Sequence, residues 1–210
     1  MAARPCAKAL LALLCLAACT PQGDPGIGPS GFSDDFERTD LGDQWNNTGG
    51  PYKIVKGQLK VEGARNKPLW LRRTLPHDVS IELDVQSASA DGDIKLEVFG
   101  DGVSKAETTS YTATSYVVIF GGWRNTLNVL ARMNEHGKDR VVGPTFKVEP
   151  GRTYHMKIER RGDTIKAWVD DRELASLKDP EPLSGVGHDH FAFNNWAVPL
   201  TFDNLRVRAL

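Results

Sequence analysis

The sequence predicts an all-β domain, a two-sheet antiparallel sandwich or jelly roll, and three observations support this prediction. Apolar and polar residues alternate over short stretches, and turn-forming residues interrupt these stretches about every 8–12 positions. No segment after residue 31 has a convincing helical period. No internal repeat occurs at the periods of solenoids or propellers.

Composition sets the broad class of the protein. The chain has 210 residues, of which 40% are hydrophobic and 25% charged, enough for one domain with a buried core. Its net charge is −1, and it has no basic stripe, only short pairs such as Arg72-Arg73 and Arg160-Arg161. This near balance argues against nucleic acid as the main partner.

The first 18 residues are predicted to be a signal peptide. Arg4 and Lys8 precede a short apolar run that is too short to span a bilayer. The run ends in Leu-Ala-Ala-Cys at Cys19, which resembles the lipobox of bacterial lipoproteins. The resemblance implies cleavage before Cys19, lipidation of its thiol and stable anchoring by several acyl chains. The alternative is a plain signal peptide with a chance cysteine.

The remaining cysteines and the next segment extend this interpretation. Cys6 and Cys15 lie in the predicted signal peptide and no cysteine follows Cys19, so we expect no disulfide. Residues 19–30 are rich in Pro and Gly and are predicted to form a lipidated, flexible tether. The jelly-roll domain is predicted over residues 31–210. We expect a lipid anchor in the bacterial cell envelope, and Thr20 favours the outer membrane.

The strands follow from the alternation, taken in chain order. The predicted strands are residues 32–36, 52–55, 58–62, 69–73, 79–86, 94–99, 115–120, 127–133, 153–160, 164–169, 191–193 and 201–207. The clearest hairpin covers residues 154–170, with Gly162 and Asp163 in its turn. Met156 and Ile158 alternate with polar residues, which predicts one buried and one wet face.

The most suggestive stretch is residues 115–132. The apolar run 116–120 has the composition of a central strand that is covered on both faces. Two glycines follow, which allow backbone angles that a side chain would block. Then come Trp123, Arg124 and Asn125, an aromatic ring beside a guanidinium and an amide. Such a corner suits a polar, ring-shaped ligand.

Both ends of the domain carry a family resemblance. The sequence FSDDFER at 32–38, with Trp45 after it, and FDNLRV at 202–207 resemble the first and last strands of laminin-G-like, concanavalin-A-like lectin/glucanase domains. The resemblance implies that these two strands pair and close a jelly roll. It leaves the function open, because that superfamily contains lectins, glycan hydrolases, lyases and inert adhesion modules.

Glu82 and Asp84 are the candidate residues for hydrolysis. Retaining glucanases of this superfamily place Glu-x-Asp-x-Glu or Glu-x-Asp-x-x-Glu along one strand, and here Glu82, Asp84 and Gln86 share a face. Gln86 can neither donate nor accept the catalytic proton, and retention needs two carboxyl groups about 5 Å apart. Glu97 on the next strand could substitute, but only with an unusual geometry. We therefore predict no catalysis and a solvated strand face.

Metal binding is a further expectation. The resemblance implies that a structural Ca²⁺ bridges the terminal strands, with Asp34, Asp35 and Asp203 as the candidate ligands. His188 and His190 could point the same way on a strand, but a zinc site there would need a third ligand.

Tryptophans beside polar groups are the strongest sign of a ligand. Sugar rings stack their apolar C–H faces on indole while amides and charged groups take the hydroxyls. Trp45 and Trp70 are predicted to be core residues. The predicted ligand-binding residues are Trp123, Arg124, Asn125, Arg132, Asn195 and Trp196.

These features predict a lipid-anchored extracytoplasmic protein that binds a glycan or polysaccharide without catalysis. A polysaccharide hydrolase or lyase of the lectin/glucanase superfamily is the first alternative. An envelope module that binds protein is the second.

Overall fold

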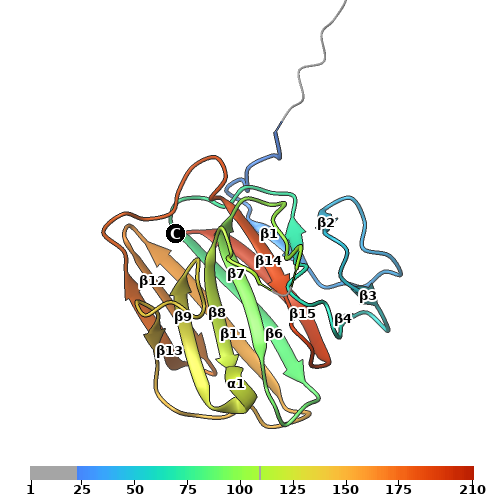
Figure 1. Cartoon of the computed structure of the whole chain (residues 1–210). Coiled ribbons are helices and arrows are strands. Elements are labelled where there is room, and N and C mark those ends of the chain that lie inside the picture. The colour runs from blue at the N-terminus through green and yellow to red at the C-terminus, as the bar shows by residue number, and fades with distance from the viewer. Residues whose placement is uncertain (1–22, 109) are drawn as a thin grey trace, which may run out of the picture.

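The computed structural model describes residues 23–108 and 110–210. The predicted signal peptide and Cys19 lie outside the described residues. The described chain is almost entirely β, with two antiparallel sheets packed face to face (Figure 1). This confirms the predicted all-β sandwich.

The 8-stranded sheet contains both ends of the domain. Its strands, in spatial order, are β13 (Arg172–Lys178), β12 (Thr164–Val169), β11 (Thr153–Arg161), β6 (Val79–Ser87), β15 (Leu200–Ala209), β4 (Leu59–Val61) and β3 (Lys53–Ile54), with β1 (Phe32–Asp34) also on β15. β1 pairs with β15 antiparallel, Phe32 opposite Val207. The expected pairing of the first and last strands is therefore confirmed.

The 7-stranded sheet packs against the first. Its order is β10 (Val141–Val142), β9 (Leu127–Arg132), β8 (Tyr116–Gly121), β7 (Ile94–Gly100), β14 (His190–Asn194), β5 (Leu69–Leu71) and β2 (Trp45–Asn47). A short turn, α1 (Gly122–Asn125), connects β8 to β9. In Figure 1 this sheet lies in front, with α1 at its lower end.

Three strands were not predicted: β2, β10 and β13. β2 and β10 are only three and two residues long, too short for a period of two to be recognised. β13 reads RELASLK and does not alternate strictly, since its burial runs from two exposed residues to two adjacent buried ones. A register shift between Ala167 and Trp168 in its partner β12 accounts for this break.

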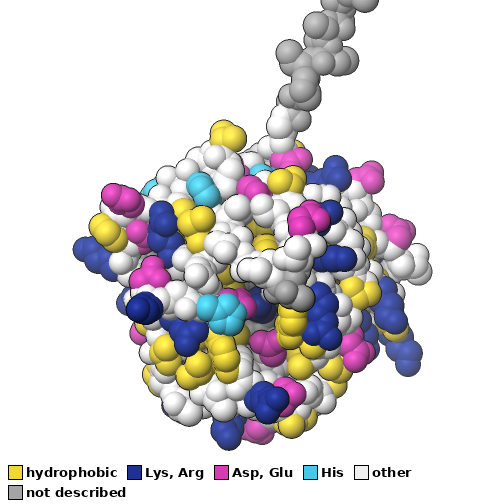
Figure 2. Space-filling view, viewed as in Figure 1, with side chains coloured by type: hydrophobic (Ala, Val, Ile, Leu, Met, Phe, Trp, Pro, Cys, Tyr) yellow, Lys and Arg dark blue, Asp and Glu magenta, His cyan; other side chains and the backbone are white. Residues whose placement is uncertain are grey.

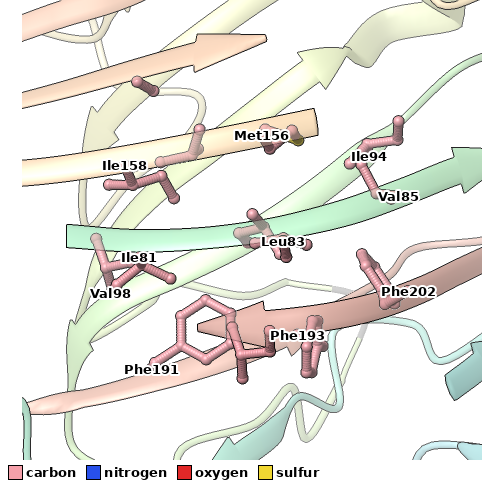
Figure 3. Close-up of a cluster of buried hydrophobic side chains, with 14 of the residues drawn as sticks. Ile81, Leu83, Val85, Ile94, Val98, Met156, Ile158, Phe191, Phe193 and Phe202 are labelled. Atoms are coloured by element: carbon pink, nitrogen blue, oxygen red, sulfur yellow. The ribbon is translucent and has the colours of Figure 1, made fainter. Parts of the chain in front are cut away.

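The core fills the space between the sheets with the inward side chains of both. Ile81, Leu83 and Val85 of β6 face Phe191 and Phe193 of β14 (Figure 3). Each fully buried side chain of this size contributes about 1.5–3 kcal/mol relative to an exposed one.

The β11–β12 hairpin has the predicted alternation. Met156 and Ile158 are buried, and Arg161 pairs with Thr164 across a two-residue turn. Gly162 in this turn has φ +57°, a left-handed conformation that suits glycine.

β8 is covered on both faces, as its apolar composition predicts. Tyr116, Val118 and Phe120 enter the core between the sheets. Val117 and Ile119 point the other way and are buried with a small apolar cluster that includes Ala113. Ala113 belongs to the connection between β7 and β8. Its described residues, 101–108 and 110–115, fold over the outer face of the 7-stranded sheet, and we call them the covering segment.

Trp70 shows how the covering segment is attached. The residue is buried as predicted, but it lies on the outer parity of β5, between the core residues Leu69 and Leu71. Its Nε1 donates a hydrogen bond of 2.9 Å to the carbonyl oxygen of Ser104. Next to it, the amide of Ala106 donates to the carbonyl of Asn66 at 2.7 Å.

Part of the predicted tether contacts the domain. Gly26 forms a β-bridge with Thr74, and Ile27 packs against the core. His190 Nε2 lies 3.2 Å from Asp24 Oδ2. The chain is thus held against the domain from residue 24 onwards. No helix among the residues that the structure describes is long and apolar enough to cross a bilayer.

Candidate functional site: a cleft on the outer face of the 7-stranded sheet

A cleft of about 820 Å³ lies beside the covering segment. Figure 2 shows a hollow on the face that carries β7, β8 and β9. Its lining residues are Asn66, Asp91, Asp93, Lys95, Ser110, Tyr111, Thr112, Ile119, Trp123, Arg124, Asn134, Glu135, His136, Trp196, Ala197 and Val198. Trp123, Arg124 and Trp196 of the predicted ligand-binding residues are among them.

Strand direction brings the two tryptophans to one edge. β8 and β14 both pair antiparallel with β7, so they run in the same direction and end where β7 begins. Trp123 follows β8 and Trp196 follows β14. The start of β7 therefore lies between the two tryptophans.

The Trp123 corner has a left-handed backbone. The φ angles are +50° at Trp123, +58° at Arg124 and +62° at Asn125. Each such residue costs about 1–3 kcal/mol, so the conformation persists only where the surrounding structure fixes it. The side chain of Asn125 fixes this corner: Nδ2 donates to the carbonyls of Ala90 and Val148 at 3.0 and 2.7 Å, and Oδ1 accepts from the amide of Val148 at 2.9 Å.

Asn125 is therefore a structural residue and not a ligand-binding one. Its side chain is 7% exposed, and both amide atoms are engaged by the protein. The prediction of this corner placed the amide beside the ligand, whereas the fold uses the amide to hold Trp123 and Arg124 in place.

Guanidinium groups hold both tryptophan rings. Arg140 lies 4.6 Å from the ring centre of Trp123, and the His136 ring meets the same indole edge-on at 5.5 Å. Arg65 lies 4.6 Å from the ring centre of Trp196. Cation–π contacts of this kind stabilise the rings by about 0.5–1 kcal/mol each at exposed sites. Both indoles are half-buried.

Two predicted ligand-binding residues are placed elsewhere. Asn195 is fully buried; its Oδ1 accepts from the amide of Ala64 at 3.0 Å and its Nδ2 donates to the carbonyl of Val198 at 2.7 Å. Arg132 pairs across the sheet with Tyr116, a core residue, so its side chain leaves the sheet on the side away from the cleft. Its Nε donates to Asp179 Oδ2 at 2.9 Å.

The cleft floor contains a buried lysine that the sequence did not single out. Lys95 is 2% exposed and lies on the outer parity of β7. Its Nζ is 2.7 Å from Glu135 Oε2 and 3.0 Å from Asn66 Oδ1. The charged residues within the otherwise apolar strand β7 are the only sequence feature that points to Lys95, but alternation alone would place such residues in solvent.

Glu97, two residues along, fastens the covering segment. Its carboxylate accepts from Tyr111 Oη at 3.0 and 3.1 Å, from Ser115 Oγ and from Asn194 Nδ2. The residue is 0% exposed, and this burial raises the pKa of its carboxyl group. Glu97 is thus sealed beneath Tyr111 and has no direct access to the cleft.

Glu97 cannot serve as the second catalytic carboxylate beside Glu82 either, because β6 and β7 belong to different sheets. Glu82 and Asp84 lie on the outer face of the 8-stranded sheet, where Glu82 accepts from Arg208 at 2.9 Å and Asp84 lies 3.0 Å from His155 Nδ1. The prediction that Glu97 could serve as partner to Glu82 is wrong.

The terminal strands do not form the expected calcium site. Asp34 accepts from the Arg38 guanidinium, from Trp45 Nε1 at 2.8 Å and from the amide of Phe36 at 2.9 Å. Although burial acts to raise the pKa of Asp34, these bonds hold it below its ordinary value. A dication would have to displace Arg38, so these residues do not fit Ca²⁺.

The other metal expectations have a similar outcome. Asp203 Oδ2 lies 3.3 Å from Gln58 Nε2, and Asp35 is exposed and accepts from the amide of Glu37. His188 Nδ1 lies 2.7 Å from the carbonyl oxygen of Thr114. Within residues 23–108 and 110–210, no group of three or more His, Cys, Asp and Glu side chains could hold a metal ion.

Asp93 is a cleft residue that no pattern in the sequence singles out. It directly precedes β7 with φ +57°, and its amide donates to the carbonyl of Gly121 at 2.9 Å. Burial raises the pKa of its carboxyl group, with Lys95 acting in the opposite sense. A lone aspartate before a strand is a common turn residue, so its role depends on the cleft around it.

Comparison with known proteins bears on this site. No family model matches the chain. It is 25% identical over 158 residues to an extracellular exo-alpha-L-arabinofuranosidase of Streptomyces chartreusis, a match that covers 74% of this chain and 18% of that enzyme. The chain thus spans less than a fifth of this relative.

Solved structures are similar over most of the chain. A carbohydrate-binding module, CBM66 of Bacillus subtilis, has a TM-score of 0.58 at 17% identity and covers 79% of this chain and 96% of its own. The beta-glucanase of Bacillus licheniformis has a TM-score of 0.62 at 11% identity and covers 91% and 100%. A protein of unknown function with a galectin-like fold from Bacillus subtilis has a TM-score of 0.62 at 13% identity and covers 84% and 94%.

The domain therefore has the jelly-roll fold of the concanavalin-A-like lectin/glucanase domains. Carbohydrate-binding modules and glycosidases are among the proteins that share this fold.

Proposed function

We propose that the protein binds carbohydrate in the cleft without catalysing a reaction. The observation that carries this proposal is the pair Trp123 and Trp196 at one sheet edge, with the polar floor of the cleft between them. Indole faces stack against sugar rings, and the charged and amide groups of the floor take hydroxyls.

The carboxyl groups of the cleft favour binding over hydrolysis. Glycosidases use two carboxyl groups, about 5–5.5 Å apart for retention and about 6.5–9.5 Å apart for inversion, one of them with a raised pKa. Glu135 is held by Lys95, and Glu97 is sealed. Asp93 and the exposed Asp91 remain, both in the loop before β7, and no free acid from another element lines the described cleft.

Arabinofuranoside hydrolysis is the second candidate. It is favoured by the raised pKa of Asp93 and by the similarity to the Streptomyces enzyme. Release of arabinose from arabinan by the purified chain, abolished in Asp93→Asn and Glu135→Gln, would establish it in place of a binding role.

Affinity electrophoresis of the purified chain through gels that contain arabinan, β-glucan or mucin tests binding. We expect retardation by at least one polymer, and Trp123→Ala or Trp196→Ala should weaken it about tenfold, the equivalent of about 1.4 kcal/mol. Trp168→Ala, a half-buried tryptophan on the 8-stranded sheet beneath Lys157, is the matched control and should bind as the wild type does. A chain that no polymer retards would contradict the proposal.

We also propose that Cys19 anchors the domain to the bacterial cell envelope, in the outer membrane. The contacts made from residue 24 onwards support a short connection, because residues 20–23 span at most about 14 Å when extended. Incorporation of labelled palmitate by the wild type but not by Cys19→Ala, with release of the variant from the membrane fraction, is the expected result. Equal labelling of both chains would exclude this anchor.

A further inference from the structure

Asp93 lies between the two tryptophans. It directly precedes β7, the strand that separates β8 from β14, and the next residue, Ile94, pairs with Phe120 near the end of β8. Neighbouring strands are about 4.8 Å apart, so the corners that follow β8 and β14 are separated by about 10 Å. Contact distances of about 3.5–4.0 Å on each side leave room for a single ring.

The carboxylate of Asp93 has no partner in the described part of the chain. It forms no hydrogen bond and no ion pair there, although it is half-buried and lines the cleft. Asp34, Asp84, Asp101 and Asp179 each accept at least two hydrogen bonds or lie within an ion pair. A half-buried charge normally acquires such a partner, because desolvation without one is unfavourable.

The backbone at Asp93 is also in the left-handed region. Gly92 before it has no room for a side chain, since a Cβ would lie 2.7 Å from the carbonyl oxygen of Gly121. The turn that presents Asp93 is thus fixed against the Trp123 corner. Strain of this kind at an unpaired polar group in a cleft is characteristic of a ligand contact.

We propose that Asp93 selects the ligand, its carboxylate accepting hydrogen bonds from two adjacent hydroxyls of a neutral sugar ring that lies between Trp123 and Trp196. This inference rests on the proposed carbohydrate binding and adds the chemical class of the ligand. Two acceptor oxygens on one carboxylate match two vicinal hydroxyl donors. Hydrogen bonds to an ionised acceptor are the stronger kind.

The charges around Asp93 specify a neutral sugar and not an acidic one. Asp91 and Glu135 also line the cleft, and the Lys95 ammonium is neutralised by Glu135. Arg124 lines the cleft next to Trp123, and two further cations, Arg140 and Arg65, lie against the tryptophan rings without lining it. A uronate or sulfate at the floor would approach three carboxylates and one paired lysine, which is unfavourable.

The test uses the purified full chain in detergent and the polymer that retards the wild type most strongly in affinity electrophoresis. Asp93→Asn keeps the shape and the left-handed backbone, which Asn tolerates. It should weaken binding about tenfold or more, because a charged acceptor becomes a neutral amide. Asp171→Asn is the matched control: Asp171 also has a positive φ, +62°, but it is exposed in the turn between β12 and β13. It should bind as the wild type does.

The outcomes separate this inference from the proposed function. Loss of binding in Asp93→Asn, together with retention in Asp171→Asn and no retardation of the wild type by polygalacturonate, supports the inference. Full binding by Asp93→Asn while Trp123→Ala loses it overturns the role of Asp93 and leaves carbohydrate binding intact. A wild type retarded by polygalacturonate but by no neutral polymer overturns the ligand class. A wild type that no polymer retards overturns both proposals.

Discussion

The outer faces of the two sheets carry similar residues and differ in what covers them. The outer face of the 8-stranded sheet presents charged residues in compensated pairs, such as Glu82 with Arg208 and Lys157 with Glu159. The outer face of the 7-stranded sheet also contains acidic and basic residues, Lys95 and Glu97, but these are buried. One face is an open ladder of ion pairs, and the other holds a cleft.

The connections between strands explain the difference. β11 and β12 join through a two-residue turn at Gly162 and Asp163, so their own connection cannot fold over the sheet. β7 and β8 join through the covering segment, which returns across its own sheet and bonds to Trp70 and Glu97. Whether a charged side chain on an outer face is buried therefore depends on the loops that cover the sheet, and not on its position in the strand's alternation.

The largest predicted effect compares the two glutamates. Glu97→Ala leaves the donors of Tyr111, Ser115 and Asn194 without their acceptor in a buried place, and we expect a loss of about 3 kcal/mol or more in the free energy of unfolding. Glu82→Ala breaks a partly exposed pair and should cost less than about 1 kcal/mol. Urea denaturation of both variants measures this, and equal losses would erase the distinction between the faces.

Asparagines give the next comparison. Asn125→Ala removes three hydrogen bonds from a left-handed corner, and we expect a loss of about 2–3 kcal/mol together with weaker polymer retardation. Asn204→Ala, at an exposed bulge of β15 with φ +52°, loses one bond to Asp84 and should cost about 1 kcal/mol. Thermal unfolding measures the loss of stability, and affinity electrophoresis measures whether polymer binding at the Trp123 corner is weakened. Unchanged binding by Asn125→Ala would show that the corner does not need this support.

The smallest predicted effects are the pH dependences of stability at Asp93 and Glu82, which have opposite signs. Burial raises the pKa of Asp93 in the folded state, so the ionised carboxylate destabilises that state. The destabilisation is complete above the folded-state pKa and absent below the unfolded-state pKa. Asp93→Asn should therefore be more stable than the wild type at pH 7, and this gain should vanish as the pH falls through the folded pKa to below the unfolded value near 3.8.

Glu82 has the opposite sign. Partial burial acts to raise its pKa, but the hydrogen bond from Arg208 holds it below the ordinary value. Its stabilisation is present above the unfolded pKa and is lost as the pH falls through the folded pKa. Glu82→Gln should thus be less stable than the wild type at pH 7 by about 0.2–1 kcal/mol and equal to it in strong acid. Denaturation across the acid range measures both variants, and slopes of the same sign would contradict the contrast.

The candidate site was predicted in part, and its residues show why. Trp123, Arg124 and Trp196 stand out because large aromatics beside polar residues follow strands. Asn125 and Asn195 share those corners, yet their amides are consumed by the backbone of other segments, such as Ala90, Val148 and Ala64. These hydrogen-bond partners are far away in the sequence, so the residues next to each asparagine do not indicate them. From the sequence alone, a structural asparagine therefore cannot be told from a ligand-binding one.

Alternation and turn residues act over a few neighbouring positions, so they predict the all-β sandwich and the central strand covered on both faces. The pairing of the terminal strands came from the family resemblance of the two ends of the domain. Only the folded molecule shows the cleft, the burial of Lys95 and Glu97, and the place of Asp93 between two tryptophans. These depend on β7 lying between β8 and β14 and on a loop that returns over the sheet, which are contacts between residues far apart in the chain.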